Sequence, residues 1–261
     1  MMGIFDLDPV ELEKFLFVMF RVGALILFVP ILGSGQVPNR VKIGFIIFVT
    51  IAVFPMVRFT PMPEPQSLFE LVIYLFSEIT IGLAVAYSAR LLFTAVQIAG
   101  TVVDFQMGFG VVNVIDPQTE TQVSITAQFQ NILAVLIFLA ADAHHIIIGA
   151  IVESFFLINP AKIDFSTFTP EIMMMLFKAT FITAIKIAAP IMAILFFISV
   201  GLGLVARTVP QMNVFIVGFP LQIGVGLLMV GLSMSFFSIV FQGQIDQLPD
   251  RFLGVMQSFK V

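Results

Sequence analysis

The sequence predicts an all-α protein of many hydrophobic helices, with long broken helices, helical hairpins and no β-sheet. Of its 261 residues, 59% are hydrophobic and only 11% are charged, which lies outside the range of soluble globular domains. The apolar residues form runs long enough for transmembrane helices, and polar or proline-containing segments interrupt these runs. We therefore expect a membrane protein of two helical halves, residues 1–116 and 117–261, without a separate soluble domain.

Charge and residue usage exclude several kinds of partner and site. The net charge is −4 and the 12 basic residues are scattered, so no surface for nucleic acid is expected. Cysteine is absent, which excludes disulfides and thiolate metal sites. Tryptophan is also absent and only two tyrosines occur, so the usual aromatic belts at the membrane interfaces are almost missing. We therefore expect many apolar faces to contact protein rather than lipid.

Two helices are predicted before residue 67. Asp8-Pro9-Val10-Glu11 combines an N-cap acceptor, a proline and a carboxylate, so a helix should begin at Pro9 and continue to Leu32. Arg21 lies inside this helix, where an arginine at membrane depth is expected to be paired or to reach toward the interface. A second apolar run, from Val41 to Thr60, ends at a proline-rich segment.

A long helix with one polar face is predicted from Leu68 to about Val103. Ser67-Leu68-Phe69-Glu70 is a capping box that opens it. Polar residues then recur at steps of three and four, which places them along one face; they are Tyr87, Arg90, Thr94, Gln97, Thr101 and Asp104. This face either forms hydrogen bonds with a neighbouring helix or lines an aqueous path.

A glycine-rich segment follows this helix. Gly108 and Gly110 bracket Phe109 and permit a backbone conformation closed to most residues. Asp116-Pro117 then caps a new helix, whose first turns carry further polar residues at steps of three and four: Thr121, Ser124, Gln128 and Asn131. Since two polar faces converge on one apolar loop, the segment is predicted to be a plug or lid, and the alternative is a simple connector.

Asp142-Ala143-His144-His145 interrupts the next apolar run and predicts a tight hairpin between two helices. Two histidines beside a carboxylate suggest a metal site. However, adjacent side chains on a helix point about 100° apart, and no His-Glu-x-x-His pattern accompanies them. We therefore predict no metal site here.

The segment from Ala206 to Gly224 interrupts two long apolar runs near the C-terminus. It contains Arg207, Pro210, Gln211, Asn213, Gly218 and Pro220. Each proline removes a backbone donor, and an arginine at bilayer depth costs about 2.5–3.5 kcal/mol. The segment is therefore expected to be buried in protein or to lie beside water. The alternative is a short polar turn between two ordinary transmembrane helices.

The residues alone indicate a conduit or a transporter component. Broken helices and polar faces also occur in secondary transporters, but no second broken helix is found in a corresponding position. An intramembrane enzyme is disfavoured because no nucleophile with a base, no paired carboxylates and no metal-ligand spacing is found. We therefore expect no catalytic residue and no cofactor.

Two motifs resemble those of the FliR family. Arg207-Thr208-Val209-Pro210-Gln211-Met212-Asn213 and the residues that follow to Gly224 are similar to the C-terminal signature of that family. The segment from Met107 to Gln118 is similar to its other well-marked segment, and the order of apolar runs agrees over nearly the whole chain. Homologous subunits occur in virulence type III secretion systems, so that alternative stays open.

The resemblance implies an export-gate subunit of the flagellar type III secretion system in the bacterial inner membrane, at the flagellar basal body. It implies assembly with FliP-like and FliQ-like subunits, association with an FlhB-like protein, and passage of unfolded flagellar proteins driven by the proton-motive force and a separate ATPase. It places the plug between Phe105 and Thr121. The plug residues would be Phe105, Met107, Gly108, Phe109, Gly110, Val111, Val112, Asn113, Asp116, Pro117 and Gln118.

Overall fold

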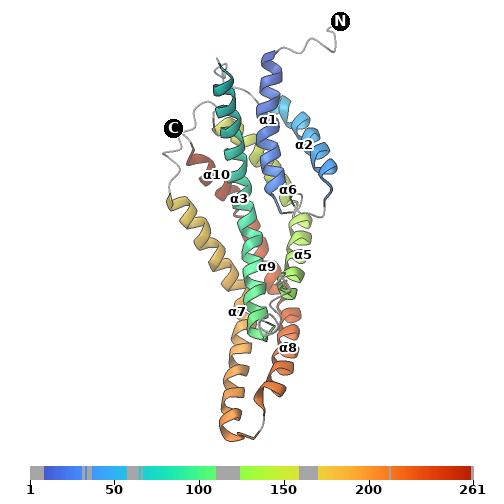
Figure 1. Cartoon of the computed structure of the whole chain (residues 1–261), viewed down its shortest axis with the longest axis vertical. Helices are drawn as coiled ribbons and strands as arrows, with labels where there is room; N and C mark the ends of the chain where they lie inside the picture. Colours follow the sequence, from blue (N-terminus) through green and yellow to red (C-terminus); the bar gives the residue numbers. More distant parts are fainter. Residues whose placement is uncertain are drawn as a thin grey trace. The chain divides into compact units, whose positions relative to one another are not determined.

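A computed structural model describes residues 9–30, 33, 37–57, 65, 67–109, 124–158, 170–211 and 213–259 (Figure 1). All regular structure in these ranges is helical, and no strand occurs among them, so the predicted all-α class is confirmed. The helices are α1 (Pro9–Phe28), α2 (Asn39–Val53), the 3-10 helix η1 (Phe54–Met56), α3 (Leu68–Met107), α5 (Ile125–Ala140), α6 (Ala143–Leu157), α7 (Pro170–Thr208), α8 (Val214–Leu232), α9 (Met234–Ile245) and α10 (Leu248–Gln257).

The helices form two compact units, each assembled from separate parts of the chain. The first unit comprises Met1–Leu91, Asp142–Leu176 and Asp246–Val261, and the second comprises Leu92–Ala141 and Phe177–Ile245. Each unit thus takes residues from both sides of Asp116. The predicted boundary at Asp116 lies outside the described residues and stays a prediction.

The first unit contains a buried ion pair. The Arg21 side chain on α1 donates from Nε and Nη2 to the two carboxylate oxygens of Glu78 on α3, at 2.5 and 2.9 Å. Its Nη1 donates to Ser154 Oγ on α6 at 3.0 Å, and its guanidinium carbon lies 3.9 Å from the ring centroid of Phe155. Arg21 and Glu78 are 1% and 0% exposed. The expectation that Arg21 is paired is therefore confirmed.

Packing in the first unit otherwise depends on apolar contacts. α1 packs along α2, and α6 packs on α10 and α1. The ring of Phe17 on α1 meets Tyr74 on α3 edge to face, with centroids 6.3 Å apart. The ion pair therefore lies within a core of closely packed helices, where its charges are shielded from water.

The second unit has an aromatic core. Phe93 on α3 lies 5.5 Å from Phe138 on α5 and 5.9 Å from Phe241 on α9, measured between ring centroids. Thr183 on α7 donates a hydrogen bond to Gln244 Oε1 on α9 at 2.8 Å. These contacts join the second half of α3 to helices that follow far later in the sequence.

Several helices are long and apolar enough to cross a membrane. Among the described residues, four segments meet this criterion by themselves: Asn39–Met56, Leu68–Met107, Glu171–Thr208 and Val214–Leu232. α5 and α6 meet it only together, as a pair of helices broken at Ala141 and Asp142. Because α5 belongs to the second unit and α6 to the first, the hairpin predicted around Asp142 stays a prediction.

Candidate functional site

In the second unit, the polar face of α3 is exposed at Gln97 and Thr101 and buried at Asp104. Gln97 and Thr101 are exposed and Thr94 is half-buried, whereas the alternating residues Val96 and Val103 are fully buried. Thr101 Oγ1 donates to the backbone carbonyl of Gln97 at 2.8 Å, so this hydroxyl is satisfied within the helix. Gln128 on α5 is also exposed. The exposed side chains of Gln97 and Gln128 can therefore contact a partner or water, and both alternatives stay open.

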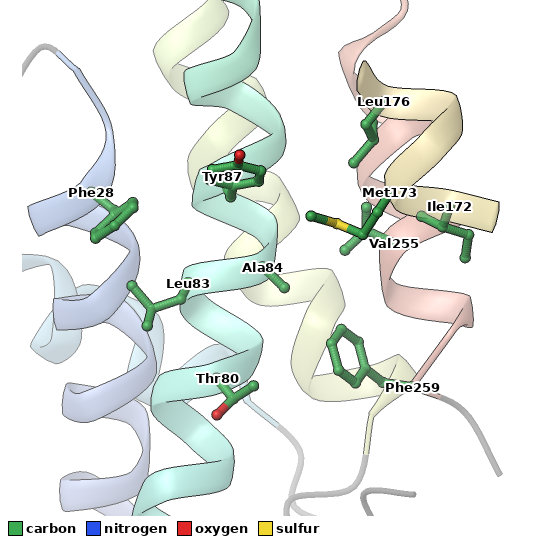
Figure 2. Close-up of a pocket in the computed structure, with 10 residues that line it drawn as sticks. All are labelled: Phe28, Thr80, Leu83, Ala84, Tyr87, Ile172, Met173, Leu176, Val255 and Phe259. Carbon is green, nitrogen blue, oxygen red and sulfur yellow. The ribbon is translucent and has the colours of Figure 1, made fainter. Parts of the chain in front are cut away.

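Arg90 and Tyr87 belong to the first unit, where Tyr87 lines an apolar cavity and Arg90 lies near another lining residue, Phe28. The Arg90 guanidinium carbon lies 5.1 Å from the ring centroid of Phe28. Figure 2 shows Phe28 and Tyr87 among the residues that line a cavity of about 420 Å³. The other lining residues come from α3, α7 and the C-terminal region: Thr80, Leu83, Ala84, Ile172, Met173, Leu176, Val255 and Phe259. This volume suits an apolar group from a ligand or a partner chain.

Asp104 and Ser124 are brought together, 20 residues apart in the sequence. Ser124 Oγ donates to Asp104 Oδ2 at 2.5 Å, and the Thr126 backbone N–H donates to the same oxygen at 3.2 Å. Ser124 is also the N-cap of α5, since its Oγ accepts from the Ala127 backbone N–H at 3.0 Å. The other carboxylate oxygen of Asp104 is buried and has no hydrogen-bond partner. The Asp104–Ser124 contact thus joins the end of α3 to the start of α5.

Close backbone packing supports this contact. Gly100 lies on α3, one helical turn before Asp104. A Cβ atom at this position would overlap the backbone of Ala127 on α5. Only glycine therefore allows α3 and α5 to approach each other here. The sequence prediction did not single out Gly100, because a lone glycine in an apolar helix has no distinguishing pattern.

α3 ends at the start of the candidate plug segment, residues 105–118. The Phe109 N–H donates to the Asp104 carbonyl and the Gly108 N–H to the Phe105 carbonyl, at 3.1 and 3.2 Å, which is a Schellman motif. Gly108 has a φ of 93°, a conformation in which other residues are strained. Phe105 is 77% exposed, whereas Met107 is fully buried.

The rest of the candidate plug segment lies outside the described residues. This part comprises residues 110–118, and the predicted plug residues in it are Gly110, Val111, Val112, Asn113, Asp116, Pro117 and Gln118. At the N-terminal end of this segment, which the structure describes, a Cβ atom on Gly108 would lie 2.6 Å from the ring of Phe219 on α8. The segment therefore starts from a point that is packed against α8 within the second unit.

The interrupted segment near the C-terminus forms a helical hairpin. α7 ends at Thr208, and α8 begins at Val214. Asn213 caps α8 by accepting from the Phe215 N–H at 3.2 Å. Arg207, Pro210, Gln211 and Asn213 are all exposed, so the chain itself does not bury this segment. The structure agrees with the short polar turn, and the surroundings of this turn in an assembly stay open.

The two arms of this hairpin meet at Gly218. Gly218 is buried, and a Cβ atom there would lie 3.1 Å from Leu202 Cδ1 on α7. Gln222 Nε2 donates to Ser199 Oγ on α7 at 3.0 Å. Pro220 lies inside α8 and is exposed. Predicted motif residues thus lie both at the turn and on the arms. Ser199 and Gln222, which join the arms, had not been predicted as a pair.

The fold defines a class of protein: an all-helical chain with several helices able to span a membrane and with polar residues concentrated at helix ends and on one helix face. Comparison with known proteins specifies this class. Residues 12–248 match the family described as bacterial export proteins, family 1. The chain belongs to this family.

Several relatives match the chain over most of its length, and most of these are flagellar proteins. The flagellar biosynthetic protein FliR of Bacillus subtilis is 38% identical over 244 residues, which cover 92% of each chain. The FliR protein of Aquifex aeolicus is 30% identical over 97% of this chain and 99% of its own. The surface presentation of antigens protein SpaR of Shigella flexneri is 28% identical over 228 residues. The resemblance to the FliR family and the expected class of function, flagellar protein export, are therefore confirmed.

Proposed function

We propose that this chain is a subunit of the export gate of the flagellar type III secretion system, where it helps to form both the conduit and its plug. The observation that carries the proposal is the Asp104–Ser124 contact. It joins the residues on both sides of the candidate plug segment, so that the segment leaves from and returns to one place. A plug needs such a fixed base, because it must return to the same position after each passage.

The candidate plug segment has the composition of an apolar constriction. Phe109, Val111, Val112 and Val114 supply apolar bulk. A hydrophobic constriction can stop ions by excluding water, and a larger polypeptide can still displace it. The polar face of α3 then continues the path as a wall without a specific binding site.

Deletion of residues 110–114 in the assembled complex tests the plug. The deletion keeps Gly108 next to Phe219 and keeps the Asp104–Ser124 contact. We expect increased membrane conductance to small ions with protein export retained. The matched control removes residues 163–167 from another connector and should leave conductance unchanged. Unchanged conductance in assembled complexes with the 110–114 deletion would refute the plug.

The exposed apolar helices support the proposed partners. Only 17% of an 18-residue apolar stretch within α8 is buried by the rest of the chain, so the remainder must contact lipid or other subunits. We propose FliP-like and FliQ-like subunits and an FlhB-like protein as those partners, with membrane lipids on the remaining surface. The location proposed for the complex is the bacterial inner membrane at the flagellar basal body. A role in a virulence system is the alternative, which the similarity to SpaR keeps open.

A conduit can be distinguished from a solute carrier on the polar face of α3. A wide path has no single binding site, so Gln97→Asn and Thr101→Ser should each reduce export only modestly. A carrier binds its solute through a few residues and would lose transport sharply at one of them. Export of flagellar proteins should be measured for each single variant, and no catalytic residue or cofactor is proposed for this chain.

A further inference from the structure

The geometry points to a divalent transition-metal site formed by Asp142, His144 and His145, where α5 gives way to α6. These are the chain's only two histidines. One ligand atom from each of the three side chains can be chosen so that all lie within 4.8 Å of one another. Nothing in the proposed export function uses these groups.

Asp142 and the two histidines lie together at the start of α6. Asp142 has a φ of 52°, in the left-handed region that non-glycine residues rarely adopt. The chain enters α6 through this residue, and the rings of His144 and His145 then lie 4.2 Å apart between centroids, 36° from parallel. Adjacent positions on a helix point about 100° apart, but the two imidazole rings approach each other within the first turn of α6.

The three donors are not committed to other contacts that the described structure shows. Asp142 occupies the N-cap position of α6, yet its side chain makes no capping hydrogen bond. The Asp142 backbone carbonyl accepts from the His145 N–H instead, at 2.9 Å. His144 Nδ1 is buried without a hydrogen-bond partner. His145 Nδ1 lies 3.8 Å from Asp142 Oδ1, which is too long for a hydrogen bond.

The donor set selects the class of metal. Two imidazole nitrogens and one carboxylate oxygen suit Zn²⁺ and related transition metals, whereas Ca²⁺ and Mg²⁺ prefer oxygen ligands alone. Ligand bonds of about 2.0–2.2 Å require the donors to move slightly closer. The Asp142 and His145 side chains are 76% and 69% exposed, so they can rotate to do so. Water would complete the coordination, and the metal would fix the first turn of α6 to Asp142.

A zinc-binding measurement tests this site. It uses the full chain in its co-expressed membrane complex, produced without a polyhistidine tag. Equilibrium dialysis with Zn²⁺ should give one more bound zinc per copy of this chain in the wild type than in the His144→Ala/His145→Ala variant. Asp142→Asn should weaken zinc affinity by more than about tenfold. Loss of a group that only supports a metal ligand already costs about that much, and Asp142 would itself be a ligand. The control Glu153→Gln changes another exposed carboxylate on α6 and should bind zinc as the wild type does.

A second measurement uses only the wild-type complex, so it does not depend on whether a variant folds. Cu²⁺ added to the wild-type complex at one equivalent should give an electron paramagnetic resonance spectrum with splitting from two nitrogen ligands. Equal zinc binding by the wild type and the double histidine variant would overturn the proposal. So would a copper spectrum without nitrogen splitting.

Discussion

At the residue scale, a buried contact in the first unit joins Arg21 to Glu78, Ser154 and Phe155. Burial of two charges is costly, and their mutual attraction offsets that cost only with good geometry and further hydrogen bonds. Here two hydrogen bonds join the charged groups, and a third joins Arg21 to Ser154. The pair therefore links α1, α3 and α6 specifically, which apolar packing alone would not do.

Removal of one charge of this pair should be more harmful than removal of both. Arg21→Met or Glu78→Leu leaves an uncompensated buried charge and should destabilise the protein by about 3–5 kcal/mol. The double variant should recover much of this loss, because apolar residues of similar size can replace a buried ion pair. Thermal stability of the purified complex measures the effect. A double variant less stable than both single variants would contradict the prediction.

The Asp104–Ser124 contact gives a second prediction at this scale. Asp104→Ala removes the acceptor for the Ser124 hydroxyl and the Thr126 N–H, which should cost about 1–3 kcal/mol. We expect faster proteolysis between residues 110 and 123. The exposed neighbour Thr101 bonds within its own helix, so Thr101→Ala serves as the control. Equal cleavage rates in both variants would show that the contact does not hold the segment.

At the element scale, the sequence predicted where helices begin, but it did not predict which helices contact one another within the chain. Pro9 and the capping box at Ser67 predicted the starts of α1 and α3 correctly, because caps are local signals. The break between α5 and α6 was predicted from Asp142 and the two histidines, and the direction of the chain after this break stays a prediction. The partner of Arg21 was not predictable either, because Glu78 lies 57 residues away.

The hairpin of α7 and α8 allows a matched test of two glycines on one helix. Gly218→Val should prevent the arms from packing, since a Cβ atom there already crowds Leu202. Gly224→Val adds the same side chain where no atom lies within 4 Å, so the chain itself should accommodate it. We expect loss of assembly or export for Gly218→Val, measured by motility and by accumulation of the complex. Equal motility of the two variants would contradict this.

At the scale of the whole molecule, the apolar surface predicts dependence on other subunits. Long apolar side chains such as Phe197 and Phe215 are more than 70% exposed. A surface of this kind requires lipid or partner chains. The chain should therefore be degraded or aggregate when produced alone and should accumulate when the proposed partners are co-produced. A stable monomer in mild detergent without partners would argue against this prediction.

The family could be predicted from the sequence because two motifs are local strings of residues. The candidate site could be predicted only in part. Periodicity placed Asp104 and Ser124 on polar faces, but their contact depends on the close approach of two helices at Gly100, which no local pattern encodes. The polar segment at Arg207 could be located from its sequence, but its environment in an assembly depends on other chains and stays a prediction.

The distance in sequence between Arg21 and Glu78 also sets an order of events during synthesis. Translation at about 5–20 residues per second places Glu78 about 3–11 s behind Arg21, and Ser154 follows later still. During that interval the guanidinium must remain in water or at the membrane surface, because an unpaired arginine at the bilayer centre costs about 2.5–3.5 kcal/mol. α1 therefore reaches its final depth only after α3 has been made.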